Sequence, residues 1–178
     1  AVLAPRDAFE FEPVILPYVR RFIPREEYLE ERSGPIAIND VEIRTSIRHR
    51  HPVETYGLHF RYGGKTVSYL PCTRFFAELA GDYEAHAPDV LIINVLRFRD
   101  AMDVDHLTFD DARTLIAGED ARDPRQMIAD GAQRRLALVA RVSEQLVGDP
   151  DALARGLEED FRIRAYAAYD GWTYDELD

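Results

Sequence analysis

Two segments in the first half of the chain alternate apolar and polar residues, which is the pattern of β-strands with one buried face. They are residues 41–48 and residues 56–62. Gly63-Gly64 follows the second segment and suits the positive backbone angles of a tight hairpin, so residues 65–70 are expected to return as its partner strand. Residues 36–38 precede an Asn-Asp turn signal and are expected to pair with residues 41–48.

Residues 90–96 form a continuous apolar run, which is typical of a central strand covered on both faces by helices. A short helix is predicted before this strand, with Thr73 as its cap and Leu79 on its apolar side. After the strand, Thr108 and Asp111 have the spacing of a capping box and predict a helix to about Ala117.

The second half of the chain predicts two further helices and a last strand. Asp123-Pro124 is expected to open a helix that stops at Gly148. Its apolar face comprises Met127, Ile128, Leu136, Val139, Val142 and Leu146. The next helix is expected from Asp149-Pro150, with Leu153 and Leu157 on its apolar side, and the late strand alternates at Phe161, Ile163, Ala165 and Ala167. Strands followed by a buried strand and helices predict one α/β layered domain over residues 1–178.

Residues 1–35 are rich in proline and are expected to be mostly loop. Within them, residues 14–16 lie between two prolines and are a candidate edge strand, and residues 25–32 are a candidate short helix or extended arm. The sequence starts at Ala1 inside this loop-like stretch, so a piece of a longer protein, or a processed one, is expected.

Composition and charge restrict the class of function. The chain has 178 residues and a formal net charge of −11, which fits one sizeable core and argues against nonspecific attraction to nucleic acid. Four arginines close in sequence are interpreted as a solvated strand face in preference to a basic groove: Arg44, Arg48, Arg50 and Arg61. The single cysteine, Cys72, excludes an internal disulfide framework and favours the cytoplasm. We expect neither a membrane span nor a secretory leader, because no apolar run has the length or the flanks of one.

Three segments carry a family resemblance. Residues 51–57 read His-Pro-Val-Glu-Thr-Tyr-Gly, residues 70–74 read Leu-Pro-Cys-Thr-Arg, and residues 106–112 read His-Leu-Thr-Phe-Asp-Asp-Ala. In this order they resemble the C-terminal half of a metallo-β-lactamase-fold hydrolase, in the branch that contains ribonuclease Z and related phosphodiesterases. The resemblance implies an α/β fold, namely the C-terminal half of a four-layer αβ/βα sandwich, and metal-dependent hydrolysis of the phosphodiester type.

The resemblance also implies site residues. His51 stands at a metal-ligand position, and Cys72 stands where the family has the Asp that bridges two metals. The implied cofactor is zinc or manganese, and a thiolate suits zinc better. His106 is a candidate contact for a substrate phosphate, and Asn94 and Arg97 at the carboxyl end of the buried strand are candidates to face a substrate pocket. The alternatives are a strand-end histidine bonded to backbone for His51, a small buried hydrophobe for Cys72, a helix-cap residue for His106 and a surface salt bridge for Arg97.

The other three histidines are not assigned to the site. His49 precedes His51 by two residues and shares its side of the strand if the strand continues, so it is a weaker site candidate, and a surface position is preferred for it. His59 is expected to be solvated because it shares a polar strand face with Arg61. His86 follows the short helix in an expected loop and is assigned no function.

The family's His-x-His-x-Asp-His segment is absent from the sequence, and residues 118–148 lack the later histidine ligand and depart from the family. Three explanations stay open: half of a longer enzyme, a relative that has lost the chemistry, or a chain completed by a second one. The prediction is a metallo-β-lactamase-superfamily hydrolase, impaired on its own, with a small-molecule or RNA phosphodiester as substrate. The alternative is a non-catalytic binding or assembly module whose apolar sheet face is covered by a missing N-terminal half or by a second copy.

Overall fold

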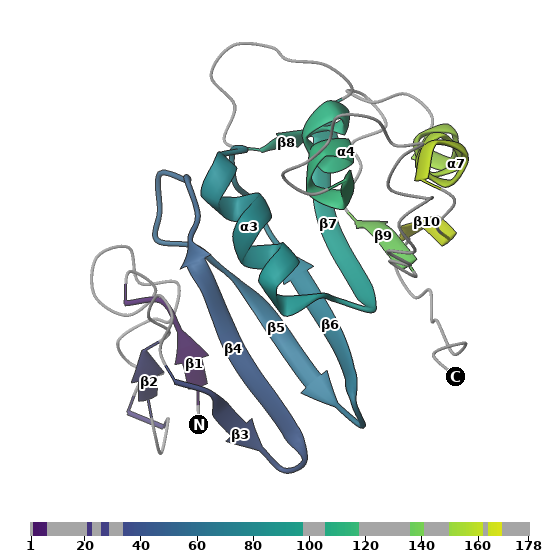
Figure 1. Ribbon diagram of the computed structural model, residues 1–178. Helices are drawn as coiled ribbons and strands as arrows, with labels where there is room; N and C mark the ends of the chain where they lie inside the picture. The colour runs from purple at the N-terminus through teal and green to yellow at the C-terminus, as the bar shows by residue number, and fades with distance from the viewer. Residues whose placement is uncertain are drawn as a thin grey trace.

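The computed structural model contains a mixed β-sheet with three helices packed on it (Figure 1). The structure describes residues 2–6, 21–22, 26–28, 34–97, 106–117, 136–140, 150–161 and 164–168. A separate pair of short parallel strands is formed by β1 (Val2–Ala4) and β2 (Glu26–Tyr28). The second of these lies in the predicted arm, whereas the candidate strand at residues 14–16 lies outside the described residues.

The antiparallel half of the main sheet follows the alternating pattern of the sequence. Its strands are β3 (Ile36–Ile38), β4 (Val41–Arg48), β5 (Tyr56–Tyr62) and β6 (Lys65–Leu70), each paired with the next. Gly63 and Gly64 turn β5 into β6 at φ values of 57° and 79°, a region that side chains disfavour. These strands and their hairpins were predicted, and the prediction is confirmed.

The parallel half of the sheet is centred on β7 (Val90–Arg97). It lies between β6 and β9 (Leu136–Ala140), and β10 (Arg164–Ala168) follows beside β9. A short strand, β8 (Leu107–Thr108), pairs with the end of β7. The apolar run at residues 90–96 is therefore an interior strand, as its composition predicted.

Three helices lie along one face of this sheet (Figure 1). They are α3 (Ala77–His86), α4 (Phe109–Ala117) and α7 (Pro150–Phe161), and α4 packs against both of the others. Their contacts with the sheet build one apolar core, whose fully buried side chains include Leu70, Leu79, Ile93, Leu107, Leu115 and Leu157. Among the residues described, no helix is long and apolar enough to cross a membrane.

The predicted capping box is present at the start of α4. The backbone N–H of Thr108 donates to Asp111 Oδ2 at 2.8 Å, and the N–H of Asp111 donates back to Thr108 Oγ1 at 3.2 Å. The predicted cap of α3 was wrong, because that helix starts at Ala77 without a side-chain cap. The hydroxyl of Thr73 instead accepts from the N–H of Arg50 at 3.1 Å, so it joins two loops.

The sequence prediction was also wrong at Leu136–Ala140, which is a strand and no part of a helix. These five consecutive apolar residues fit a helical face and a buried parallel strand equally well. They form a strand because they pair with β7 on one side and with β10 on the other. The rest of the predicted helix lies outside the described residues. The late strand begins at Arg164, because Phe161 still belongs to α7.

Candidate functional site

Two loops at one end of the sheet carry His51 and Cys72, the two predicted metal ligands. Backbone and hydroxyl hydrogen bonds join these loops: the N–H of Arg50 donates to Thr73 Oγ1, and the N–H of Arg74 donates to the carbonyl of Arg50, each at 3.1 Å. The first loop follows β4 and the second follows β6. The two predicted residues therefore lie on neighbouring loops whose relative position is fixed by the backbone.

His51 is half-buried, and a neighbouring hydroxyl orients its ring. Thr55 donates its hydroxyl to the carbonyl of Val53 at 3.0 Å, so its oxygen accepts from Nδ1–H of His51 at 3.4 Å. Nε2 is then the lone-pair nitrogen of the neutral ring, which is the arrangement that presents a histidine to a metal. The ring of His106 lies 6.2 Å away, centroid to centroid, at an interplanar angle of 67°.

Cys72 is a free, half-buried thiol. Its sulfur accepts a hydrogen bond from Nδ2 of Asn94 at 3.1 Å, and Asn94 itself is 4% exposed. Among the residues described, Asn94 Oδ1 has no hydrogen-bond partner. The structure thus brings Asn94 to Cys72 and His106 to His51. Arg97 is the last residue of β7, and its side chain lies outside the described part of the chain.

The donors at this end of the sheet do not make a complete metal site. A catalytic zinc is usually held by three converging protein ligands. Within the described ranges, the one group of three or more histidine, cysteine and carboxylate ligand atoms that lie close together is that of His59, Asp82 and His86, within 4.8 Å of one another. His51 and Cys72 offer the right nitrogen and sulfur chemistry, but the described residues add no third ligand to them at that spacing.

His49 was predicted at the surface, and this prediction was wrong, because its side chain is 2% exposed. Its Nε2 lies 3.2 Å from Ser46 Oγ. Burial lowers the pKa of His49 to about 4, against a smaller opposite effect of a contact with the Cys72 backbone. A neutral imidazole therefore lies directly beneath the Cys72 loop at neutral pH.

His59 was predicted to be solvated and is instead buried, at 2% exposure, because α3 covers this face of β5. Its Nδ1 lies 2.7 Å from Ser68 Oγ, and its ring stacks on that of His86 at 3.6 Å and 1°. Asp82 Oδ2 lies 3.7 Å from Nε2 of His59. Burial lowers the pKa of His59, whereas the Asp82 carboxylate acts in the opposite direction.

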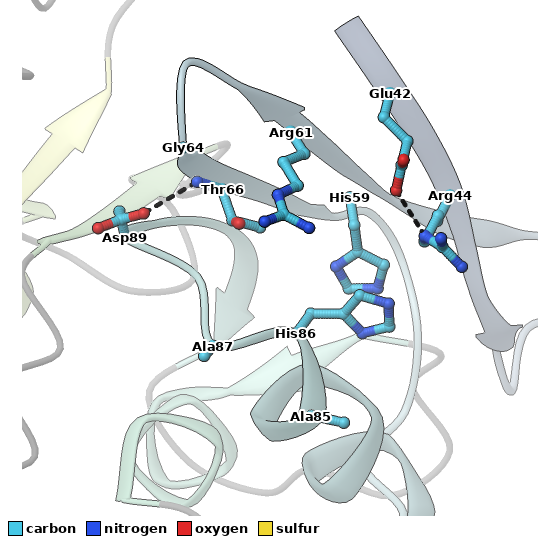
Figure 2. A pocket seen from close by; sticks show the side chains of 10 residues that line it. All are labelled: Glu42, Arg44, His59, Arg61, Gly64, Thr66, Ala85, His86, Ala87 and Asp89. Atoms are coloured by element: carbon cyan, nitrogen blue, oxygen red, sulfur yellow. Dashed lines mark hydrogen bonds and ion pairs between the residues drawn. The ribbon is translucent and has the colours of Figure 1, made fainter. Parts of the chain in front are cut away.

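A pocket of about 480 Å³ opens beside the stacked histidines (Figure 2). Arg61 and Arg44 of the neighbouring strands line it, and Arg44 pairs with Glu42 at 2.8 Å. This polar pocket and its histidines were missed from the sequence. The signal that was present is Asp82 followed four residues later by His86, a spacing that places both on one side of a helix.

No protein-family model matches the sequence, and no curated protein matches it. Solved structures do resemble the fold. The metallo-beta-lactamase fold protein YhfI from Bacillus subtilis is 17% identical, with a TM-score of 0.61 over 83% of this chain and 53% of its own. A metallo hydrolase from the archaeon Ignicoccus hospitalis is 13% identical, with a TM-score of 0.61 over 97% of this chain and 66% of its own.

A third similar structure is a diphosphatase from the PhnP family, 17% identical, with a TM-score of 0.58 over 96% of this chain and 55% of its own. The chain thus spans between 53% and 66% of the length of these three relatives, in keeping with the predicted extent. The chain therefore has the metallo-β-lactamase fold, over roughly half of the length of the proteins that share it, as its His51 and Cys72 segments predicted.

Proposed function

We propose that this chain forms part of a metal-dependent hydrolase of phosphodiester bonds, with its reaction site at the end of the sheet where His51 and Cys72 lie. The observation that carries the proposal is the pair of joined loops. They hold a histidine with a free Nε2 lone pair and a thiol at the edge of the mixed sheet where β4, β6 and β7 all end. Ligands of open α/β sheets bind at the carboxyl ends of the strands. Asn94 contacts Cys72 and His106 lies beside His51, which supports a shared site for these four candidate residues.

The names of the similar proteins support this assignment. One is a metallo hydrolase and another a diphosphatase, and both are longer than this chain. Further ligands are therefore proposed to come from the rest of a longer protein or from a second chain. Cys72 favours zinc over manganese, because sulfur is a soft ligand. The hydrogen bond from Asn94 holds the Cys72 sulfur in a fixed position at this end of the sheet.

The test replaces Cys72 by Asp, the residue that stands at this position in the family. Asn94 can donate to a carboxylate as it does to the sulfur. We expect Cys72→Asp to raise both manganese binding and hydrolysis of bis(4-nitrophenyl) phosphate, by about tenfold or more. Cys72→Ala is the matched control and should bind and hydrolyse less than the parent chain. Both variants also carry His86→Gln. This change removes a ligand from the separate group of His59, Asp82 and His86, so metal bound there is not included in the measured metal content. Equal metal content and activity in Cys72→Asp and Cys72→Ala contradict the proposal.

A second function is favoured by the sheet face opposite the helices. Cross-strand partners on that face are apolar and incompletely covered: Leu58, Phe60, Val67 and Ile92 are half-buried, and Tyr69 is 37% exposed. An apolar face of this kind suits a binding or assembly module that packs against a second sheet. Light scattering of the purified chain tests this role. If the chain stays monomeric at every concentration, so that this face is open to solvent, the result argues against the assembly role.

A further inference from the structure

We propose that His59, Asp82 and His86 form a metal site of their own, which binds a divalent transition cation such as zinc between α3 and β5. This site is separate from the one under the proposed function and does not depend on it. Its three ligands come from the middle of β5 and from the last turns of α3, whereas His51 and Cys72 lie on loops that follow β4 and β6.

His59 provides the first argument. It is 2% exposed, and among the residues described its Nε2 has no hydrogen-bond partner. Asp82 Oδ2 lies 3.7 Å away, which is too far for a hydrogen bond. Two ligands on one tetrahedral zinc ion, each about 2.1 Å from it, lie about 3.4 Å apart. The gap between the nitrogen and the carboxylate therefore has the width of a shared metal ion.

His86 provides the second argument through its tautomer. Its Nδ1 lies 2.8 Å from the backbone carbonyl of Asp82. A carbonyl only accepts, so Nδ1 carries the proton and Nε2 holds the lone pair of the neutral ring. Metal-binding histidines commonly donate their other ring N–H to a carbonyl in this way. Ser68 Oγ lies 2.7 Å from Nδ1 of His59 and orients that ring; metal binding through Nε2 requires this hydroxyl to accept from Nδ1–H.

Burial and charge at the cluster also favour a cation. Asp82 is 8% exposed, and its Oδ2 accepts the backbone N–H of Ile47 at 3.1 Å, which fixes an acidic side chain beside the two histidines. Two imidazoles and one carboxylate correspond to the two-histidine, one-glutamate ligand set of catalytic zinc sites.

One movement is needed for binding. The rings of His59 and His86 are parallel at 3.6 Å, and two parallel rings cannot both direct an in-plane lone pair at one ion. His86 is the last residue of α3, is half-buried and lines the pocket (Figure 2), so its ring has space to tilt out of the stack while Nδ1 stays bonded to the Asp82 carbonyl. The pocket of about 480 Å³ also gives water access as a fourth ligand.

The experiment measures zinc binding to the purified chain by competition with a chromophoric chelator, together with ¹⁵N NMR of the imidazoles. We expect zinc to shift Nε2 of both His59 and His86. His86→Gln should weaken this binding by about tenfold or more. The control Glu84→Gln, which removes an exposed carboxylate from the same helix, should leave it unchanged. Asp82→Asn is the second variant and should weaken binding in the same way. Thermal unfolding without zinc confirms that each variant folds.

The proposal is overturned if His86→Gln binds zinc as tightly as the parent chain, or if zinc leaves the resonances of His59 and His86 in place. Zinc that shifts only His51 also overturns it while supporting the proposed function. Zinc that shifts His59 and His86 alone supports this site and leaves the reaction site to be tested by the Cys72 variants.

Discussion

Gly57 in β5 is the position where adding one methyl group has the most direct structural consequence. A Cβ atom there lies 1.9 Å from the hydroxyl oxygen of Tyr83 and 2.8 Å from the backbone oxygen of Tyr69. Tyr83 is 2% exposed, and its hydroxyl donates to that same backbone oxygen at 3.1 Å. The side chain of Tyr83 cannot stay in place in Gly57→Ala, so this variant both overfills the core and breaks a buried hydrogen bond.

Overfilling a packed core lowers the free energy of unfolding by about 1–3 kcal/mol, and loss of a buried hydrogen bond lowers it by about a further 1 kcal/mol. We therefore expect Gly57→Ala to destabilise the chain by about 2–4 kcal/mol. For a domain of this size, that corresponds to a fall in the unfolding midpoint of roughly 5–15 °C. Urea titration followed by circular dichroism measures the first quantity, and a thermal scan measures the second.

Gly34→Ala is the matched control, because Gly34 is exposed and nothing lies within 4 Å of its added Cβ. It should change stability by less than about 0.5 kcal/mol. Tyr83→Phe removes the oxygen that the new methyl group meets. In the double variant, Gly57→Ala should thus cost less than it does alone, which a double-mutant cycle measures. If Gly57→Ala is as stable as Gly34→Ala, α3 does not pack on β5 as described.

Three further predictions test buried polar groups. The pKa of His49 is 6.5 in the unfolded chain and about 4 in the folded chain, where burial lowers it. Between pH 6.5 and pH 4 the unfolded chain therefore binds a proton at His49 that the folded chain does not. The free energy of unfolding should fall by about 3 kcal/mol as the pH is lowered through this range. Urea titrations across this range should lose that part of the slope in His49→Gln. Ser68→Ala frees the ring of His59 and should weaken zinc binding by about 10–100-fold in the chelator assay. Thr108→Ala removes the capping bonds of α4 and should lower the urea-derived stability by about 1 kcal/mol, whereas Thr114→Ala within the helix should change it less.

Local pattern predicted the elements whose burial repeats along the chain. Residues 41–48 and 56–62 alternate because the two faces of each strand meet different surroundings: in β5, His59 faces α3, whereas Leu58 and Phe60 lie on the opposite face. This alternation is visible in the sequence. Local pattern could not predict the strand at Leu136–Ala140. Five consecutive apolar residues have neither the helical nor the strand period. They form a strand because they pair with β7 and β10, which are distant in sequence.

The histidines show the same limit for the site. His51 could be found because its segment has a recognisable order of residue types. His59 was expected in solvent because it alternates with apolar residues, and alternation only separates two faces of a strand. It does not tell whether the polar face meets water or a helix that brings Asp82 and Tyr83 against it. A buried polar face and a solvated one have the same sequence pattern, and only the position of α3 distinguishes them.

Helix α3 connects the two candidate sites, because one lies on the helix and the other contacts its first turn. Its first turn is tied to the His51 loop, because the guanidinium of Arg50 lies 4.7 Å from the ring centroid of Phe76 and 3.9 Å from Glu78. Its last turns hold Asp82 and His86. A metal bound there would join α3 to β5 and so restrain the helix that follows directly from the Cys72 loop. Removal of zinc from the His59 cluster should then increase hydrogen exchange in α3 and in residues 72–76 together, whereas a cluster without metal predicts no change in either.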